Sequence, residues 1–176
     1  MDIYKLTIDD ETGMEAISLV EFPATEQNFL AFSDDTLWKF NQEQRCVTGV
    51  VMLADTPIYR YQNGKEFYIM FDSETIKKMM IKYSKDGLMN SLNIEHKGDK
   101  IDGVFLYESY IYNADKGIKP NDFSVTDGSW IASFKVENDE IWEKIKNGEV
   151  KGFSLEGYFN MKPVDEFDEF LNSYLK

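Results

Sequence analysis

The chain has 176 residues, of which 43% are hydrophobic and 15% aromatic, so it is long and apolar enough to bury one core. Its formal net charge of −13 repels nucleic acid, because the basic residues do not cluster. No segment approaches the roughly 18 apolar residues of a membrane helix, and a single cysteine, Cys46, cannot form an internal disulfide. We therefore expect a cytoplasmic protein with no nucleic-acid or membrane partner.

The first quarter of the chain predicts short strands and one irregular segment. Residues 2–8 alternate apolar and polar side chains, which predicts a strand. Residues 16–20 predict a second strand that ends at Pro23, since proline lacks a donor and biases its predecessor toward extended geometry. Residues 24–45 have no clear period, and we expect a mobile arm or a loop with a helical turn. Residues 46–53 are apolar and β-branched, which predicts a buried strand.

The middle of the chain predicts a hairpin and then a helix. Asn63-Gly64 is a strong turn signal between strands at 58–61 and 66–71. Asp72 or Ser73 is expected to cap a helix that runs to about Tyr83. The apolar side chains on its inner face are Ile76, Met79, Met80 and Tyr83.

The second half predicts further strands, a second helix and a terminal helix. The expected strands are 91–96, 103–112, 129–136 and 150–161. Asn138 is expected to cap a helix to about Lys146, with Gly148 past its end. Residues 163–176 carry apolar residues at helical spacing, which predicts an amphipathic C-terminal helix. We favour packing of this helix on the domain over binding to a partner.

Together these elements predict one α+β domain over residues 1–176. The strands do not alternate regularly with helices, so a doubly wound parallel sheet is not expected. A mostly antiparallel β-barrel or curved sheet with flanking helices fits better.

The chain contains one histidine, His96, so a histidine-assisted nucleophile has no other base to use. His96 lies at the end of a predicted strand and before a polar turn, where functional sites are often built. Taken alone, a single histidine is more often a surface or structural residue.

A second candidate is Ser154, within the segment Gly152-Phe153-Ser154-Leu155-Glu156-Gly157. Alternation along a strand places Ser154 and Glu156 on one face, and the flanking glycines let another backbone approach closely. A neutral imidazole within about 3 Å can accept the proton of a serine hydroxyl. A carboxylate on the far side of the ring would orient it. Glu156 and Glu108 are the carboxylates of interest, since both lie on strands amid apolar neighbours, although an outward strand face explains either equally well.

Several segments, in a consistent order, resemble the XkdF-type phage serine proteases, relatives of the prohead proteases and more remotely of the herpesvirus assemblins. These segments are 17–24 with Asn28-Phe29, 49–52, 55–60, 71–76, 93–96, Glu108-Ser109, 128–130 and 148–157. The resemblance implies an assemblin-like fold and a head-maturation peptidase that needs no cofactor. It would cleave phage scaffold and major capsid proteins, and itself, inside the prohead in the bacterial host. It also implies Ser154 as nucleophile, His96 as general base and activity as a homodimer.

The third catalytic member is where the resemblance gives no direct answer. Assemblins use a second histidine, which this chain lacks. We rank Glu156 first, then Glu108, then Asp165, with a simple dyad as the alternative.

The sequence leaves two other functions open. One is an inactive structural or binding component of the phage head that keeps the protease fold. The other is a cysteine protease using Cys46, although a cysteine that begins an apolar strand is better explained by burial. One histidine and one cysteine leave little for a metal site beyond carboxylates, and no phosphate-binding or dinucleotide glycine pattern occurs.

Overall fold

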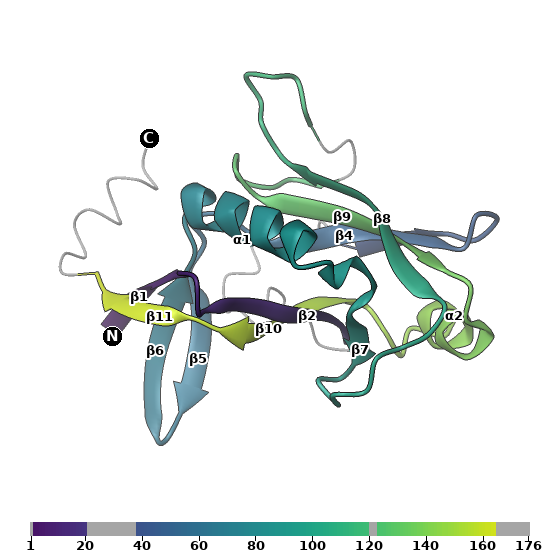
Figure 1. Cartoon of the computed structure of the whole chain (residues 1–176), viewed down its shortest axis with the longest axis horizontal. Helices are drawn as coiled ribbons and strands as arrows, with labels where there is room; N and C mark the ends of the chain where they lie inside the picture. The colour runs from purple at the N-terminus through teal and green to yellow at the C-terminus, as the bar shows by residue number, and fades with distance from the viewer. Residues whose placement is uncertain (1, 21–37, 120–122, 165–176) are drawn as a thin grey trace.

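The computed structural model describes residues 2–20, 38–119 and 123–164 (Figure 1). The strands are β1 (Asp2–Thr7), β2 (Gly13–Val20), β3 (Trp38–Asn41), β4 (Cys46–Met52), β5 (Ile58–Gln62), β6 (Lys65–Met70), β7 (Leu92–Ile94), β8 (Val104–Ile111), β9 (Trp130–Val136), β10 (Gly152–Tyr158) and β11 (Asn160–Pro163). The helices are α1 (Ser73–Lys85), the short 3₁₀ helix η1 (Leu88–Asn90) and α2 (Asp139–Lys146).

The described strands form three sheets, with the orders β11-β1-β6-β5, β10-β2-β7 and β3-β4-β9-β8. Among them, only the β1–β6 and β2–β7 pairs are parallel. The predicted α+β class and mostly antiparallel pairing are therefore confirmed. The sheets formed by the described residues do not close into a barrel.

Helix α1 packs between two of the sheets, and its inner face is the one that the sequence predicts. Ile76, Met79 and Tyr83 are buried, and the Tyr83 ring meets Trp130 of β9 edge to face at a centroid distance of 5.7 Å. Figure 1 shows α1 lying along β4 and β9, with β2 on its other side. Apolar burial of this kind supplies most of the stabilisation of a short helix.

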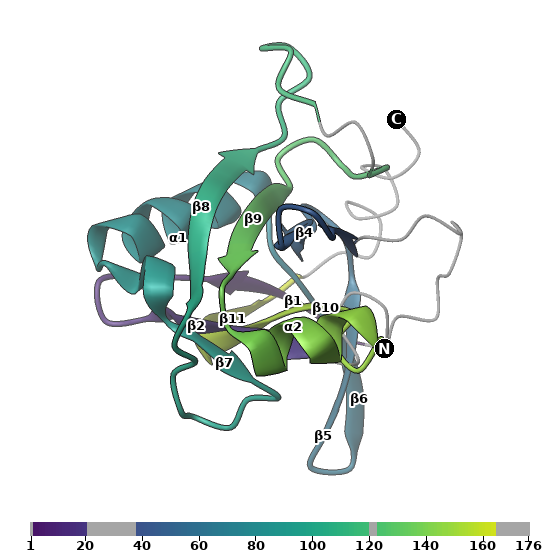
Figure 2. The same cartoon turned by 90° about the vertical axis from the view of Figure 1, so that its right-hand side faces the viewer.

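The predicted N-caps of both helices are present. The Asp72 carboxylate accepts a hydrogen bond from the Thr75 amide at 2.7 Å, and Asn138 accepts one from the Ile141 amide at 3.0 Å. Each satisfies an amide that the first helical turn leaves unpaired. Helix α2 follows the end of β9 (Figure 2) and contacts that strand, with Ile141, Trp142 and Ile145 buried.

Two predicted strands in the second half of the chain are corrected. The predicted strand at 150–161 is two strands, since β10 ends at Tyr158 beside β2 and β11, which begins at Asn160, pairs instead with β1. The predicted strand at 91–96 is shorter, since Glu95 and His96 turn away with φ of 52° and 56°.

The predicted arm at 24–45 contains a strand, β3, which pairs with β4. The rest of that prediction, residues 24–37, lies outside the described residues. So does most of the predicted C-terminal helix, residues 165–176, while Pro163 at its expected start ends β11 instead. Within the described part of the chain, no helix is both long and apolar enough to cross a membrane.

Candidate active site

The sheet β10-β2-β7 aligns three polar side chains in one row. Ser154 of β10 lies opposite Ser18 of β2, and Ser18 in turn lies beside Asn93 of β7. Directly paired residues project from the same face of a sheet. Glu156 follows Ser154 by two positions on β10, so it projects from that face as well. The row therefore gathers two serines, an amide and a carboxylate from three strands.

His96 reaches this row from the turn after β7. Its Nδ1 lies 3.0 Å from Glu156 Oε1 and 3.1 Å from Ser18 Oγ. Two consecutive residues in the left-handed region, Glu95 and His96, are uncommon for non-glycine residues and cluster at functional sites. The turn directs the imidazole toward Glu156, and 44% of the side chain stays exposed.

Glu156 is the centre of the hydrogen-bond network. Ser18 Oγ and Asn93 Nδ2 both donate to its Oε1, and His96 Nδ1 lies beside the same oxygen. Burial raises the pKa of Glu156, but hydrogen bonds from Ser18, Asn93 and His96 outweigh it and hold this pKa below its ordinary 4.5. The carboxylate is therefore ionised at neutral pH, as a group that stabilises an imidazolium must be.

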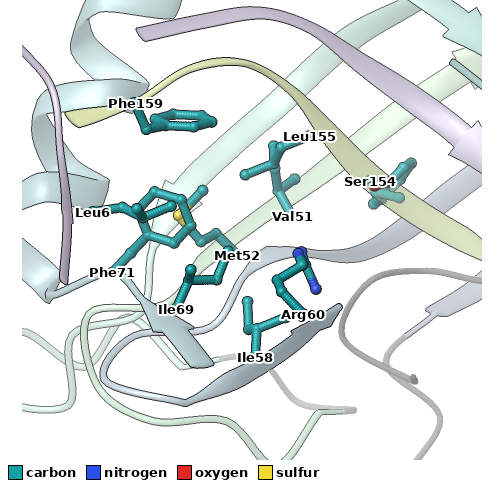
Figure 3. A pocket seen from close by; sticks show the side chains of 11 residues that line it. Leu6, Val51, Met52, Ile58, Arg60, Ile69, Phe71, Ser154, Leu155 and Phe159 are labelled. Carbon is teal, nitrogen blue, oxygen red and sulfur yellow. The ribbon is translucent and has the colours of Figure 1, made fainter. Parts of the chain in front are cut away.

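The two serines differ in access. Ser18 is 0% exposed and already bonded to Glu156, so its hydroxyl cannot meet a substrate. Ser154 is also largely buried, at 8%, but it borders a cavity of about 210 Å³. Figure 3 shows Ser154 and Leu155 at this cavity, with Arg60 facing them from β5. Phe153 and Leu155, which also line the cavity, belong to the core or pack against it and project from the other face of β10, so the cavity lies across this strand from Glu156 and His96. Ser154 lies on the strand that, among the described strands, ends the sheet, and Ser18 lies on the strand between two others.

The structure brings some of the predicted site residues together and places others elsewhere. His96 contacts Glu156, and Ser154 shares their face. Glu108 lies on β8 in another sheet, where it accepts a hydrogen bond from Ser133 at 2.7 Å. Asp165 lies outside the described residues. Cys46 begins β4 in the sheet of Glu108, and its thiol donates to the Gln44 carbonyl at 3.3 Å.

Sequence reasoning did not assign a role to Ser18 or Asn93. Ser18 stands between the apolar residues Ile17 and Leu19, a pattern that also fits any half-buried strand. Its place beside His96 depends on the parallel pairing of β2 with β7, which joins segments more than seventy residues apart. The local pattern carries no signal for such a pairing.

The part of the chain that the structure describes contains no group of three His, Cys, Asp or Glu side chains arranged to hold a metal ion.

Comparison with protein families gives a match. The family model described as "Putative phage serine protease XkdF" matches residues 34–162, which include His96, Ser154 and Glu156 but not Ser18. A search of curated proteins and a search of solved structures each found no match. Because the matched residues are most of the chain, the chain belongs to this XkdF family.

Proposed function

We propose that this chain is a phage head-maturation serine endopeptidase that cleaves scaffold and major capsid proteins, and itself, once assembly of the prohead brings them together. Ser154 is the nucleophile, His96 the general base and Glu156 the residue that orients His96. The enzyme works inside the bacterial host cell, within the assembling prohead, and as a homodimer. The proposal includes a fold related to the prohead proteases and assemblins, supported by the mostly antiparallel sheets with flanking helices.

The observation that carries the proposal is the contact between His96 and Glu156 on the strand face of Ser154. With His96 Nδ1 at 3.0 Å from the carboxylate, the proton of the neutral ring is best held on Nδ1, between Glu156 and Ser18. Nε2 is then the nitrogen that remains to accept a proton. A base of this tautomer is what a serine nucleophile requires.

The reaction would proceed in two stages. As Ser154 Oγ attacks the scissile carbonyl carbon, its proton passes to His96 Nε2, and the ionised Glu156 stabilises the imidazolium. The C–N bond then breaks, the leaving amine takes the proton from Nε2, and an acyl-enzyme remains. Water attacks the ester with its proton passing to Nε2, and Ser154 recovers that proton as the carboxylic acid leaves.

The substrate is proposed to bind as an extended peptide beside β10. Among the described strands β10 ends its sheet, since β2 is its only partner there. The hydrogen bonds made by the Ile17 and Glu95 amides join β2 to the β7 side. Because main-chain groups alternate along a strand, the N–H and C=O of Ser18 point the other way, toward Ser154 on β10. By the same alternation the N–H and C=O of Leu155 point away from β2, where the main chain of a peptide could pair with them.

The test is cleavage of the cognate scaffold and capsid proteins, followed by intact mass at concentrations that permit dimers. The parent chain is compared with Ser154→Ala and His96→Ala. Ser133→Ala is the control, since like Ser154→Ala it removes a buried strand serine, here in another sheet and bonded to Glu108.

Cleavage by the parent and Ser133→Ala, but not by the other two variants, supports the proposal. Equal cleavage by all four chains would refute the assigned nucleophile and base. If none of them cleaves even after assembly into proheads, the structural role in the phage head becomes the better account.

A further inference from the structure

The cavity beside Ser154 is apolar and has the size of one large side chain. Its volume is about 210 Å³, and apart from Arg60 and Ser154 every lining residue is apolar. An apolar cavity of about 150 Å³ is enough to hold benzene. The space therefore suits a leucine, methionine or phenylalanine side chain better than a polar one.

Arg60 gives this cavity its single charge. Arg60 lies on β5, and its guanidinium Nη1 donates to the Tyr59 carbonyl at 2.8 Å. Burial lowers its pKa. Among the described residues it has no carboxylate partner, although acidic residues number 32 in the chain. The other arginine, Arg45, pairs with Asp139 at 2.8 Å.

A half-buried guanidinium without a counter-ion is unfavourable, because desolvation is not compensated. It becomes favourable once a carboxylate binds, and guanidinium groups pair with carboxylates in two parallel hydrogen bonds. Since the chain carries a net charge of −13, acidic peptides are otherwise repelled. The positive charge of Arg60 is thus a local attraction for acidic groups in a protein whose net charge is negative.

The cavity continues past Arg60. A second cavity of about 430 Å³ shares Leu6, Arg60, Ile69 and Phe159 with the first and extends to Met161. Arg60 therefore lines both hollows, and Ser154 borders the first of them. A chain of several extended residues fits this arrangement better than a single small molecule does.

We propose that the cavity beside Ser154 is the specificity pocket of the peptidase, which takes a large apolar side chain of the substrate while Arg60 pairs with a carboxylate of the same peptide. The apolar residue lies within two positions of the scissile bond, and the acidic residue lies farther from it. This inference rests on the proposed function and adds the substrate class to it.

The test uses ten-residue peptides that carry Leu or Ala at the centre and Glu or Gln two or three residues away on either side. Cleavage by the parent chain gives the preference for reaction. Binding to the Ser154→Ala chain, followed by fluorescence anisotropy, gives the preference for occupancy without turnover. Arg60→Gln removes the proposed carboxylate partner, and Arg45→Gln is the matched control outside the cavity.

We expect the Leu–Glu peptides to bind about tenfold more tightly than the Leu–Gln and Ala–Glu peptides. Arg60→Gln abolishes the preference for Glu and keeps that for Leu, whereas Arg45→Gln keeps both. Equal affinity for Glu and Gln peptides, or a preference that survives Arg60→Gln, overturns the pocket assignment. Selective binding of the Leu–Glu peptides without cleavage by the parent chain would support the binding pocket and contradict the peptidase activity. The two proposals can therefore fail separately.

Discussion

Two regions of the molecule place a buried serine beside a carboxylate, and only one of them also contains a histidine in contact with that carboxylate. In the sheet of β4, β9 and β8, Ser133 donates to Glu108 and lies 2.8 Å from Thr48 Oγ1. In the sheet of β10, β2 and β7, Ser18 donates to Glu156 in the same manner. The second region adds His96 and a second serine, Ser154, at the edge of a cavity.

A serine–carboxylate pair on neighbouring strands is therefore a structural feature that does not by itself indicate catalysis. Such a pair satisfies two polar groups that would otherwise be costly to bury. What distinguishes the region around Glu156 is the imidazole that contacts the same carboxylate and a second serine on β10, the strand that ends this sheet among the described strands. If this difference decides function, matched substitutions in the two regions should have unequal effects.

The largest effect is expected for Glu156→Gln. A glutamine keeps the shape but cannot hold the Nδ1–H tautomer of His96 or stabilise its imidazolium, and in a serine protease triad the equivalent change costs about 10⁴-fold. We expect a loss of that order in kcat/KM for scaffold cleavage.

The matched change Glu108→Gln, in the other region, should alter kcat/KM by less than about twofold, because Glu108 contacts Ser133 and not His96. Similar losses in both variants would show that the two regions do not differ as described.

Next in size is the effect of Gly157→Ala on folding. A Cβ at Gly157 would lie 2.2 Å from the Gly13 carbonyl oxygen and 2.8 Å from Met14 Cα, so β10 and β2 would have to separate. Overpacking of this kind costs up to about 3 kcal/mol, and urea denaturation measures it.

Gly117→Ala is the control for backbone conformation alone. Gly117 has φ of +72°, and no atom of the described residues lies within 4 Å of the place that a Cβ would take. Its substitution should therefore cost only about 1 kcal/mol. If both alanine variants lose equal stability, the close approach of β10 to β2 is not what holds the row of polar residues together.

Features that depend on nearby residues could be predicted from the sequence, and features that depend on the pairing of distant strands could not. The helix ends were predictable because Asp72 and Asn138 act locally, through amides three residues away. His96 was predictable because the chain has no other histidine. Ser18 was not, since its neighbour His96 comes through a parallel pairing of distant segments. The division of 150–161 into two strands was missed because the chain changes its partner strand from β2 to β1 after Tyr158, and the local pattern does not record a strand's partner.

A smaller effect is expected for Ser18→Ala. The change removes one of the hydrogen bonds to the ionised Glu156, and a bond to a charged group contributes about 2 kcal/mol to the free energy of unfolding. Cleavage should slow about tenfold, because Glu156 is held less firmly, yet it should persist. A Ser18→Ala chain that is as inactive as Ser154→Ala would instead identify Ser18 as part of the reacting machinery.

The smallest expected effect is a pH dependence of stability. Because the folded pKa of Glu156 is lowered below its ordinary 4.5, the ionised form stabilises the fold at pH values above 4.5, and this stabilisation is lost as pH falls through the folded pKa. The difference in urea midpoint between the parent and Glu156→Gln should therefore shrink from about pH 6 to about pH 3. A difference that grows on acidification would contradict the lowered pKa.

The most direct test of the central claim is covalent labelling with a fluorophosphonate, which reacts with a serine only when a base activates it. The parent, Ser154→Ala, Ser18→Ala and His96→Ala chains are treated, and the modified residue is located by peptide mass. The account predicts one label, on Ser154, that persists in Ser18→Ala and is lost in the other two variants. Labelling of Ser18, or no labelling of the parent under conditions in which it cleaves its scaffold, would contradict it.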